Sequence, residues 1–248
     1  KRQAMIIDFH AHVERDLITK KYDIESIIQD MDANGIGVRM ISTLKGKSIR
    51  DQNDAMISYV RQYPERLMAC AVINPKEDDC IQEAERVSAV PEVKALEFNS
   101  WEYGFLPEEY EPHLEPIFDI AEQRGLPVKL FAGWGPRTMP QQWEKYIKRH
   151  PKLTFVILHI GGIDFGYGSI PFIASYDNVM CETSGQTEMQ VLHEAFGKLP
   201  AEKFLFGSNY PNQITKCSID TFQLLKLSEN YRRKMFKENA EKLLSLNV

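Results

Sequence analysis

Short apolar runs alternate along the chain with longer stretches in which apolar residues recur every three or four positions. Runs of the first kind predict buried β-strands, and the second pattern predicts amphipathic helices. We expect strands over residues 5–9, 38–42, 67–73, 93–98, 127–131, 153–158, 178–182 and 203–207. We expect helices over residues 23–33, 51–63, 79–88, 114–124, 141–149, 188–197, 219–227 and 231–246, and a helical segment that ends near residue 175. Each predicted strand is thus followed by a predicted helix.

The eight strand–helix units limit the possible folds. They share 248 residues, or 31 residues a unit, which is close to the roughly 30 residues of a βαβ unit. The sequence therefore predicts a single-domain α/β fold, a (β/α)8 TIM barrel that spans residues 1–248. An open doubly wound sheet is the alternative, but it carries a glycine-rich turn after its first strand. Here that place holds His10, Ala11 and His12.

Composition and charge narrow the classes of function. Hydrophobic residues make up 43% of the chain, which is too many for a disordered protein. The net charge of −5 argues against a nucleic-acid partner, because such proteins carry a basic excess. The sequence has neither an apolar run of about 18 residues that would span a membrane nor an opening secretory segment. The four cysteines form no CxxC pair, which favours reduced thiols and a cytoplasmic location.

The first predicted strand ends in a cluster of polar residues. In a TIM barrel the functional side chains lie at the carboxyl ends of the strands. Asp8, His10 and His12 recur at every second position, so we expect all three on one face of the strand. Two imidazoles at this spacing can bind one metal ion, because histidine nitrogen is a common ligand of zinc and related ions. The alternative is a pair of structural histidines.

Three further strands carry a candidate residue at the same end. His159 follows the sixth apolar run, Glu97 lies within the fourth, and Asn209 follows the eighth. A buried carboxylate is costly unless it is paired or bound to metal, so Glu97 is a candidate ligand or a member of an ion pair. Imidazole exchanges protons near neutral pH, which makes His159 a candidate for proton transfer. An amide cannot act as a general base, so we expect Asn209 to orient substrate or water.

These motifs together resemble the amidohydrolase superfamily, in its amidohydrolase-related branch. The resemblance covers nearly the whole chain and rests on five segments, residues 6–12, 125–134, 158–162, 206–211 and 239–244. It implies that His10 and His12 are metal ligands, that Glu97 completes their cluster, and that His159 is a ligand or an acid–base group.

Two positions depart from the family pattern. The family's fifth-strand histidine falls on Phe131, which cannot bind a metal, and its eighth-strand aspartate falls on Asn209. A binuclear site is therefore not expected. What remains is either one divalent ion, with zinc as the first choice, or a site that works without metal on an acidic substrate.

The predicted loops above the barrel supply candidate substrate contacts. Lys45 follows the second strand, Trp134 and Arg137 follow the fifth, and Tyr210 follows the eighth. A cation can bind a carboxylate or phosphate, and an aromatic wall suits a small aromatic acid. Solvated loops and plain packing are the alternatives. Residues 100–116 are expected to form a long loop, either a lid or an interface in a homo-oligomer.

These observations lead to three hypotheses about function. The first is a hydrolase of the amidohydrolase superfamily that cleaves an amide, a lactone or a related bond in a small carboxylated molecule. The second is a lyase on the same barrel, a decarboxylase or a dehydratase. The third is a barrel that binds a metabolite without catalysis, which Phe131 and Asn209 motivate. The residues leave the substrate, the metal and the oligomeric state open.

Overall fold

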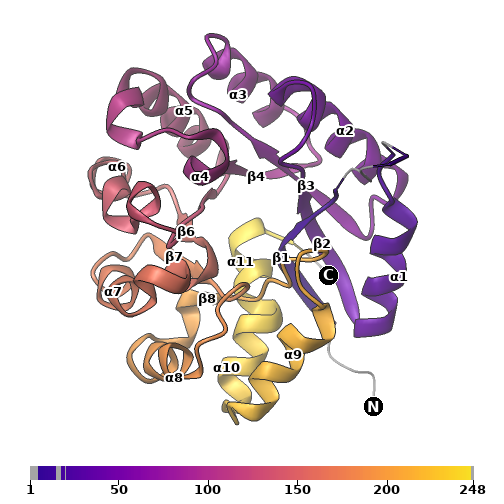
Figure 1. Cartoon of the computed structure of the whole chain (residues 1–248), viewed down its shortest axis with the longest axis vertical. Coiled ribbons are helices and arrows are strands. Elements are labelled where there is room, and N and C mark those ends of the chain that lie inside the picture. The colour runs from indigo at the N-terminus through magenta and orange to yellow at the C-terminus, as the bar shows by residue number, and fades with distance from the viewer. Residues whose placement is uncertain (1–4, 15–17, 20, 247–248) are drawn as a thin grey trace.

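The computed structural model describes residues 5–14, 18–19 and 21–246, and in this part of the chain eight parallel strands form one sheet in sequence order (Figure 1). The strands are β1 Ile6–His12, β2 Ile36–Ser42, β3 Leu67–Val72, β4 Val93–Phe98, β5 Val128–Leu130, β6 Phe155–Ile157, β7 Val179–Glu182 and β8 Phe204–Leu205. Each strand overlaps one of the predicted apolar runs. The predicted (β/α)8 barrel is confirmed.

Helices surround the strands and follow them in order around the molecule (Figure 1). The principal helices are α1 Ile24–Asn34, α2 Ile49–Gln62, α3 Cys80–Ser88, α5 Glu111–Arg124, α6 Glu144–Arg149, α7 Gly162–Ala174, α8 Met189–Lys198, α9 Thr215–Leu224, α10 Glu229–Arg233 and α11 Asn239–Leu244. Local sequence sets their ends. Asp23 caps α1 by accepting a hydrogen bond of 3.0 Å from the backbone N–H of Ser26, and Gly35 ends the helix with a φ of 70°.

The barrel closes where the first strand meets the segment that follows the last. The backbone N–H of Phe9 donates to the carbonyl of Phe206 at 2.8 Å, and the N–H of His12 donates to the carbonyl of Tyr210 at 2.6 Å. These bonds lie beyond the two residues of β8 itself. They hold the end of β1 against the loop after β8, so both contribute to the same open end of the barrel.

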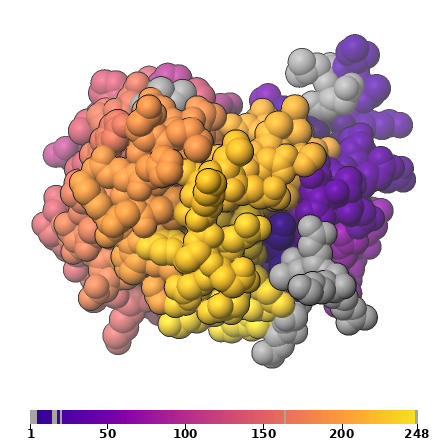
Figure 2. Space-filling model, turned by 90° about the horizontal axis from the view of Figure 1, so that it is seen from below, coloured from indigo at the N-terminus to yellow at the C-terminus, as the bar shows by residue number. Residues whose placement is uncertain are grey.

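The apolar side chains of the strands belong to two layers, one on each side of the sheet. The larger layer lies between the strands and the outer helices, and the smaller one fills the barrel with residues such as Ile7 and Met68. Leu243 and Leu244 at the end of α11 pack against this inner layer. Figure 2 shows the C-terminal helices in yellow next to the indigo N-terminal segment. The amino-terminal end of the barrel is therefore closed by apolar side chains, which leaves the carboxyl end for polar ones.

The predicted long loop over residues 100–116 is wrong in most of its length. It contains the short helix α4 Ser100–Tyr103, a 3-10 turn at Pro107–Tyr110 and the first residues of α5. Pro112 lies in the first turn of α5, where a proline fits because its missing N–H needs no partner. The helix therefore begins earlier than the apolar pattern indicates.

Candidate active site

Seven polar side chains gather at the carboxyl ends of the strands, and all of them are buried. They are His10, His12, Ser42, Glu97, Lys129, His159 and Glu182. Of the five residues predicted for the centre, three lie within one group whose ligand atoms are all within 4.8 Å of one another, namely His10, His12 and Glu97. His159 joins His10 and Glu182 in a second such group.

A β-bulge in β1 decides which of its polar residues face the site. Asp8 pairs with Arg39 and Ala11 with Ile41, so β1 has one residue more than β2 between these two pairs. The bulge breaks the simple alternation, and the prediction that Asp8 shares a face with the two histidines is wrong. Asp8 lies on the outer side of the sheet, where its Oδ2 accepts a hydrogen bond of 2.7 Å from Nε of Arg39.

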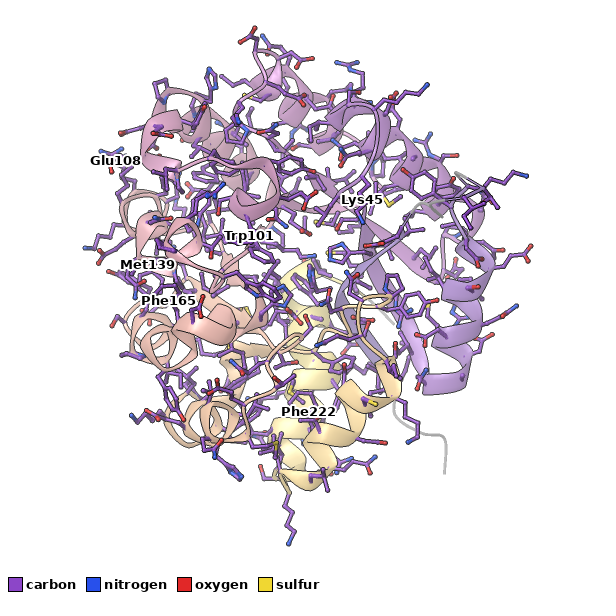
Figure 3. The ribbon with its side chains drawn as sticks, in the orientation of Figure 1. Lys45, Trp101, Glu108, Met139, Phe165 and Phe222 are labelled. Carbon is purple, nitrogen blue, oxygen red and sulfur yellow. The ribbon has the colours of Figure 1, made fainter. Side chains whose placement is uncertain are left out.

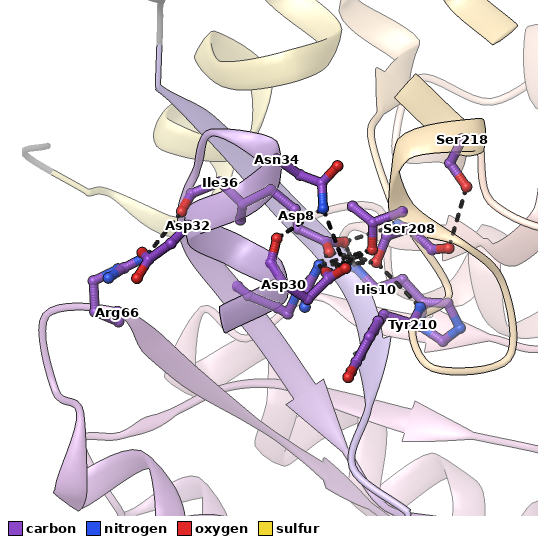
Figure 4. A network of polar contacts seen from close by, with 12 residues as sticks. Asp8, His10, Asp30, Asp32, Asn34, Ile36, Arg66, Ser208, Tyr210 and Ser218 are labelled. Carbon is purple, nitrogen blue, oxygen red and sulfur yellow. Dashed lines mark hydrogen bonds and ion pairs between the residues drawn. The ribbon is translucent and has the colours of Figure 1, made fainter. Parts of the chain in front are cut away.

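The Asp8–Arg39 pair belongs to a buried polar network outside the barrel (Figure 4). Arg39 also donates to Oδ2 of Asp30 at 2.7 Å, and the backbone N–H of Ser208 donates to Oδ1 of Asp8 at 2.9 Å. The network thus joins β1, β2, α1 and the loop after β8. It also reaches His10, whose backbone N–H donates to Oδ1 of Asp8 at 3.3 Å.

Glu97 is the centre of the first group. Its Oε2 lies 3.2 Å from Nζ of Lys129, 3.1 Å from Oγ of Ser42 and 3.9 Å from Nδ1 of His10. Ser42 donates its hydroxyl proton to Glu97. The hydroxyl oxygen of Ser42 therefore accepts a hydrogen bond of 3.0 Å from Nδ1 of His12. His12 therefore carries its proton on Nδ1 and presents an unprotonated Nε2.

The charges of this group influence each other. Burial raises the pKa of Glu97, but the charge of Lys129, the nearby His12 and the hydrogen bond from Ser42 together outweigh burial and leave that pKa below its ordinary value. Burial lowers the pKa values of His10 and His12, and the charge of Lys129 adds to both shifts. At neutral pH the group therefore holds one carboxylate, one ammonium and two neutral imidazoles.

Strand β7 fixes the position of His159. The backbone N–H of His159 donates to Oε2 of Glu182 at 3.2 Å, and Nδ1 of its ring lies 3.0 Å from both the carbonyl and the Oγ of Ser184. Ser184 donates its hydroxyl proton to Glu182 at 2.9 Å, so both of its oxygens accept from Nδ1. His159 thus presents an unprotonated Nε2, like His12.

The second group also has shifted pKa values. Burial lowers the pKa of His159 to about 4. Burial raises the pKa of Glu182 to about 7, although hydrogen bonds from Ser184 and His159 act in the opposite direction. Gly207 makes room for this carboxylate, because a Cβ atom at Gly207 would lie 2.0 Å from Oε1 of Glu182. The glycine that follows β8 is therefore part of the site.

Sequence reasoning missed Lys129 and Glu182. Both lie within apolar runs that predict strands, and each is the inward-facing charged residue of its strand. The signal was the same as at Glu97, a single charge inside an otherwise apolar strand. Applied to every strand, that criterion would have found both residues.

The residues predicted to contact substrate lie in different parts of the structure. The Trp134 ring lies 6.1 Å from that of Phe131, which in turn lies 5.3 Å from the ring of His159. Tyr210 packs against the guanidinium of Arg39 at 4.9 Å, on the side of the outer network. The backbone N–H of Asn209 donates to the carbonyl of His10 at 2.9 Å. Trp134 is thus the predicted contact that lies nearest to the imidazoles through described ring contacts.

Two of the predicted cations lie at the surface. Lys45 is exposed and lies 3.5 Å from Glu14, and Arg137 is exposed and packs over the ring of Trp101 at 5.8 Å. Figure 3 shows Lys45 among the N-terminal elements, apart from Trp101. Their role in substrate binding stays a prediction.

The two groups offer donor atoms to a divalent metal ion, but their charges oppose its binding. The donor atoms are suitable. Both ring nitrogens of His10 and Oε1 of Glu97 lack a hydrogen-bond partner in the described part of the chain, and nitrogen and oxygen atoms of these kinds are ligands of divalent ions. The charge of the two carboxylates is not suitable. Glu97 is neutralised by Lys129, and Glu182 is engaged through both of its oxygens. Neither carboxylate therefore offers an uncompensated negative charge to a divalent ion, so this arrangement does not fit one.

Fold and site together define a (β/α)8 barrel with histidines and carboxylates at its strand ends. The amidohydrolase family matches residues 7–246, and the chain belongs to this family. The resemblance stated from the motifs is confirmed. None of the curated proteins compared with the chain matches it. In the described residues no helix is both long enough and apolar enough to cross a membrane.

Solved structures support the same fold. A 5-carboxyvanillate decarboxylase from Novosphingobium aromaticivorans, complexed with manganese and a nitrobenzoic acid, is 15% identical with a TM-score of 0.75, over 99% of this chain and 97% of that one. A 2,6-dihydroxybenzoate decarboxylase from Rhizobium is 17% identical with a TM-score of 0.72, over 98% and 99%. A probable 2-pyrone-4,6-dicarboxylic acid hydrolase from Acinetobacter baumannii, with citric acid bound, is 19% identical with a TM-score of 0.73, over 97% and 99%.

Proposed function

We propose that this chain is a lyase that removes carbon dioxide from a small aromatic carboxylic acid. The observation that carries the proposal is that no carboxylate in the described site is free to act as a base on water. Glu97 is paired with Lys129, Glu182 accepts hydrogen bonds through both oxygens, and the place of the family's aspartate is taken by Asn209. Hydrolysis needs an effective base to activate water, whereas decarboxylation needs a proton donor. The lyase therefore replaces the hydrolase as our leading hypothesis.

His159 is the residue that we assign to proton transfer. Its pKa of about 4 leaves it neutral in the free protein. An anionic substrate near its ring stabilises the imidazolium, because an opposite charge within about 4–6 Å raises the pKa of a histidine. The protonated form then appears only when substrate is bound. As the bond between the ring carbon and the carboxylate breaks, its electron pair takes the proton from Nε2, which leaves an arene and carbon dioxide.

Aromatic side chains support the choice of substrate class. The ring of Phe131 contacts that of His159, and Trp134 extends this wall toward solvent. An aromatic wall beside convergent polar groups suits a flat, conjugated acid. The two decarboxylases of similar fold act on hydroxylated benzoic acids, as their names state, which supports the same class.

Hydrolysis of a lactone is the second candidate function. The unprotonated Nε2 of His159 is a base, and one structure of similar fold is a probable pyrone dicarboxylate hydrolase. A pKa of about 4 makes this imidazole a weak base toward water, so we rank the reaction second.

Isotope labelling distinguishes the two reactions. The purified chain is incubated with 2,6-dihydroxybenzoate, 5-carboxyvanillate and 2-pyrone-4,6-dicarboxylate in deuterated, 18O-labelled water. We expect release of carbon dioxide and one deuterium at the vacated ring carbon. Incorporation of 18O into a product carboxylate without loss of carbon dioxide would show hydrolysis instead. Binding of an acid without turnover, measured by calorimetry, would favour the non-catalytic barrel.

A further inference from the structure

Lys129 and Glu97 form an ion pair inside the barrel. Nζ lies 3.2 Å from Oε2, and both side chains have no exposed surface. The two residues are directly paired in the register of the neighbouring strands β4 and β5. Rigid backbone therefore holds a positive charge beside Glu97, within the buried polar cluster at the carboxyl ends of the strands.

Glu97 forms the ion pair with Lys129, and the charge of Glu182 also favours the protonated ammonium. Nζ lies 5.8 Å from the centre of the Phe9 ring and has no well-aligned hydrogen bond among the described residues. A buried ammonium without a counter-ion is costly, so its pairing with Glu97 is strongly favoured. If Glu97 bound another cation instead, Lys129 would be left as a buried charge without its ion-pair partner.

The ammonium also acts on the imidazoles around it. Nζ of Lys129 lies 3.2 Å from Oε2 of Glu97, and the ligand atoms of Glu97, His10 and His12 lie within 4.8 Å of one another. A metal ion held by these three residues would therefore lie close to the ammonium, and two positive charges at short range in a buried site repel each other. The same side chain thus occupies the carboxylate and repels an ion from the histidines.

We propose that Lys129 is the built-in cation of this site and that it keeps a divalent metal ion out. Removing its charge would free Glu97 to join His10 and His12, and three such nitrogen and oxygen ligands are enough for an open mononuclear site. The proposal concerns metal binding, so it stands or falls independently of the reaction that the site performs.

Metal titration of the intact chain tests the proposal. Calorimetry with zinc chloride and manganese chloride, and elemental analysis after dialysis, compare the wild type with Lys129→Met. Methionine has a similar length but no charge. We expect the variant to bind zinc about 100-fold more tightly or better, because an ammonium a few ångströms from a dication opposes it strongly at a partly buried site. Lys129→Arg keeps the charge and is expected to bind as weakly as the wild type.

Each outcome decides the question. Stoichiometric zinc that survives dialysis in the wild type would overturn the proposal, and so would equally weak binding by the wild type and Lys129→Met. A double variant, Glu97→Gln with Lys129→Met, has no unpaired charge and no metal anchor, and we expect it to fold without gaining affinity. If Lys129→Met alone folds poorly, refolding with zinc should recover it, and recovery that is equal without zinc would count against us.

Discussion

The backbone N–H of His159 donates a hydrogen bond of 3.2 Å to Oε2 of Glu182, so the seventh strand fixes the residue that follows the sixth. This bond supports an unusual segment. Residues 159 to 162 have φ values of 60°, 48°, 77° and 61°. Such conformations cost roughly 1–3 kcal/mol for a residue other than glycine, and they persist only where surrounding contacts hold them. Glu182 and Ser184 supply those contacts and thereby aim the His159 ring.

Replacement of His159 by alanine tests its role in proton transfer. We expect a loss of about 100-fold or more in the rate of carbon dioxide release, because general acid catalysis contributes about that much. The rate is measured with the best substrate of the labelling panel. His193, which is exposed on α8, provides the matched control, and His193→Ala should retain the wild-type rate. Equal rates for the two variants would remove His159 from the mechanism.

The pKa of Glu182 predicts a dependence of stability on pH. Burial raises its pKa in the folded state to about 7, above the ordinary value of 4.5, so the folded state binds more protons than the unfolded state between these limits. Stability contributed by this group is therefore present at low pH and is lost as the pH rises toward 7. The full effect is at most about 3 kcal/mol, from 1.36 kcal/mol for each pKa unit.

Urea unfolding from pH 4.5 to 8 measures this dependence. The histidines act in the opposite direction, since the lowered pKa of His159 makes stability rise with pH between about 4 and 6.5. The comparison is therefore made with Glu182→Gln, which removes the carboxyl alone. The stability of the wild type relative to this variant should fall as the pH rises. A difference that stays constant over this pH range would contradict the shift.

Much of the fold was predictable because it depends on repeated local patterns. Eight apolar runs with helical stretches between them specify the barrel, and its strand ends identify His10, Glu97 and His159 as site residues. The orientation of Asp8 was not predictable, because the bulge in β1 arises from its pairing with β2. A two-residue period assumes a regular strand, and only the partner strand reveals the extra residue.

The ion pair between Lys129 and Glu97 was not predictable for a similar reason. Each residue alone is a charge in an apolar run, and the sequence does not say that β4 and β5 place the two in register.

The prediction of a long loop failed for a different reason. Residues 100–116 have no clear helical period, but caps and prolines start two short helical segments before α5. These elements depend on local backbone bonds rather than on an apolar face.

Removing one member of the buried ion pair should destabilise the protein. Glu97→Gln keeps the shape of the side chain but leaves Lys129 with an uncompensated buried charge, which costs about 3–5 kcal/mol. The double variant Glu97→Gln with Lys129→Met removes both charges and should recover a large part of this loss. Urea unfolding at pH 7 gives both free energies. If the double variant is as unstable as the single one, charge pairing is not what holds these residues.

A methyl group at Gly207 should disturb the second group of the site. The added Cβ would lie 2.0 Å from Oε1 of Glu182 and 3.0 Å from Cβ of His10, so the carboxylate must move. Overpacking of this kind costs about 1–3 kcal/mol of stability. The displaced carboxylate would also release His159, so Gly207→Ala should slow carbon dioxide release as well as lower the free energy of unfolding.

Gly197 offers the matched control for this substitution. It lies near the end of α8, and a Cβ atom there would meet nothing within 4 Å. Gly197→Ala should raise the free energy of unfolding by up to about 1 kcal/mol, because alanine is the better helix former. Its rate of carbon dioxide release should equal that of the wild type. If Gly207→Ala matched this control in both measurements, the tight contact between Gly207 and Glu182 would have no part in shaping the site.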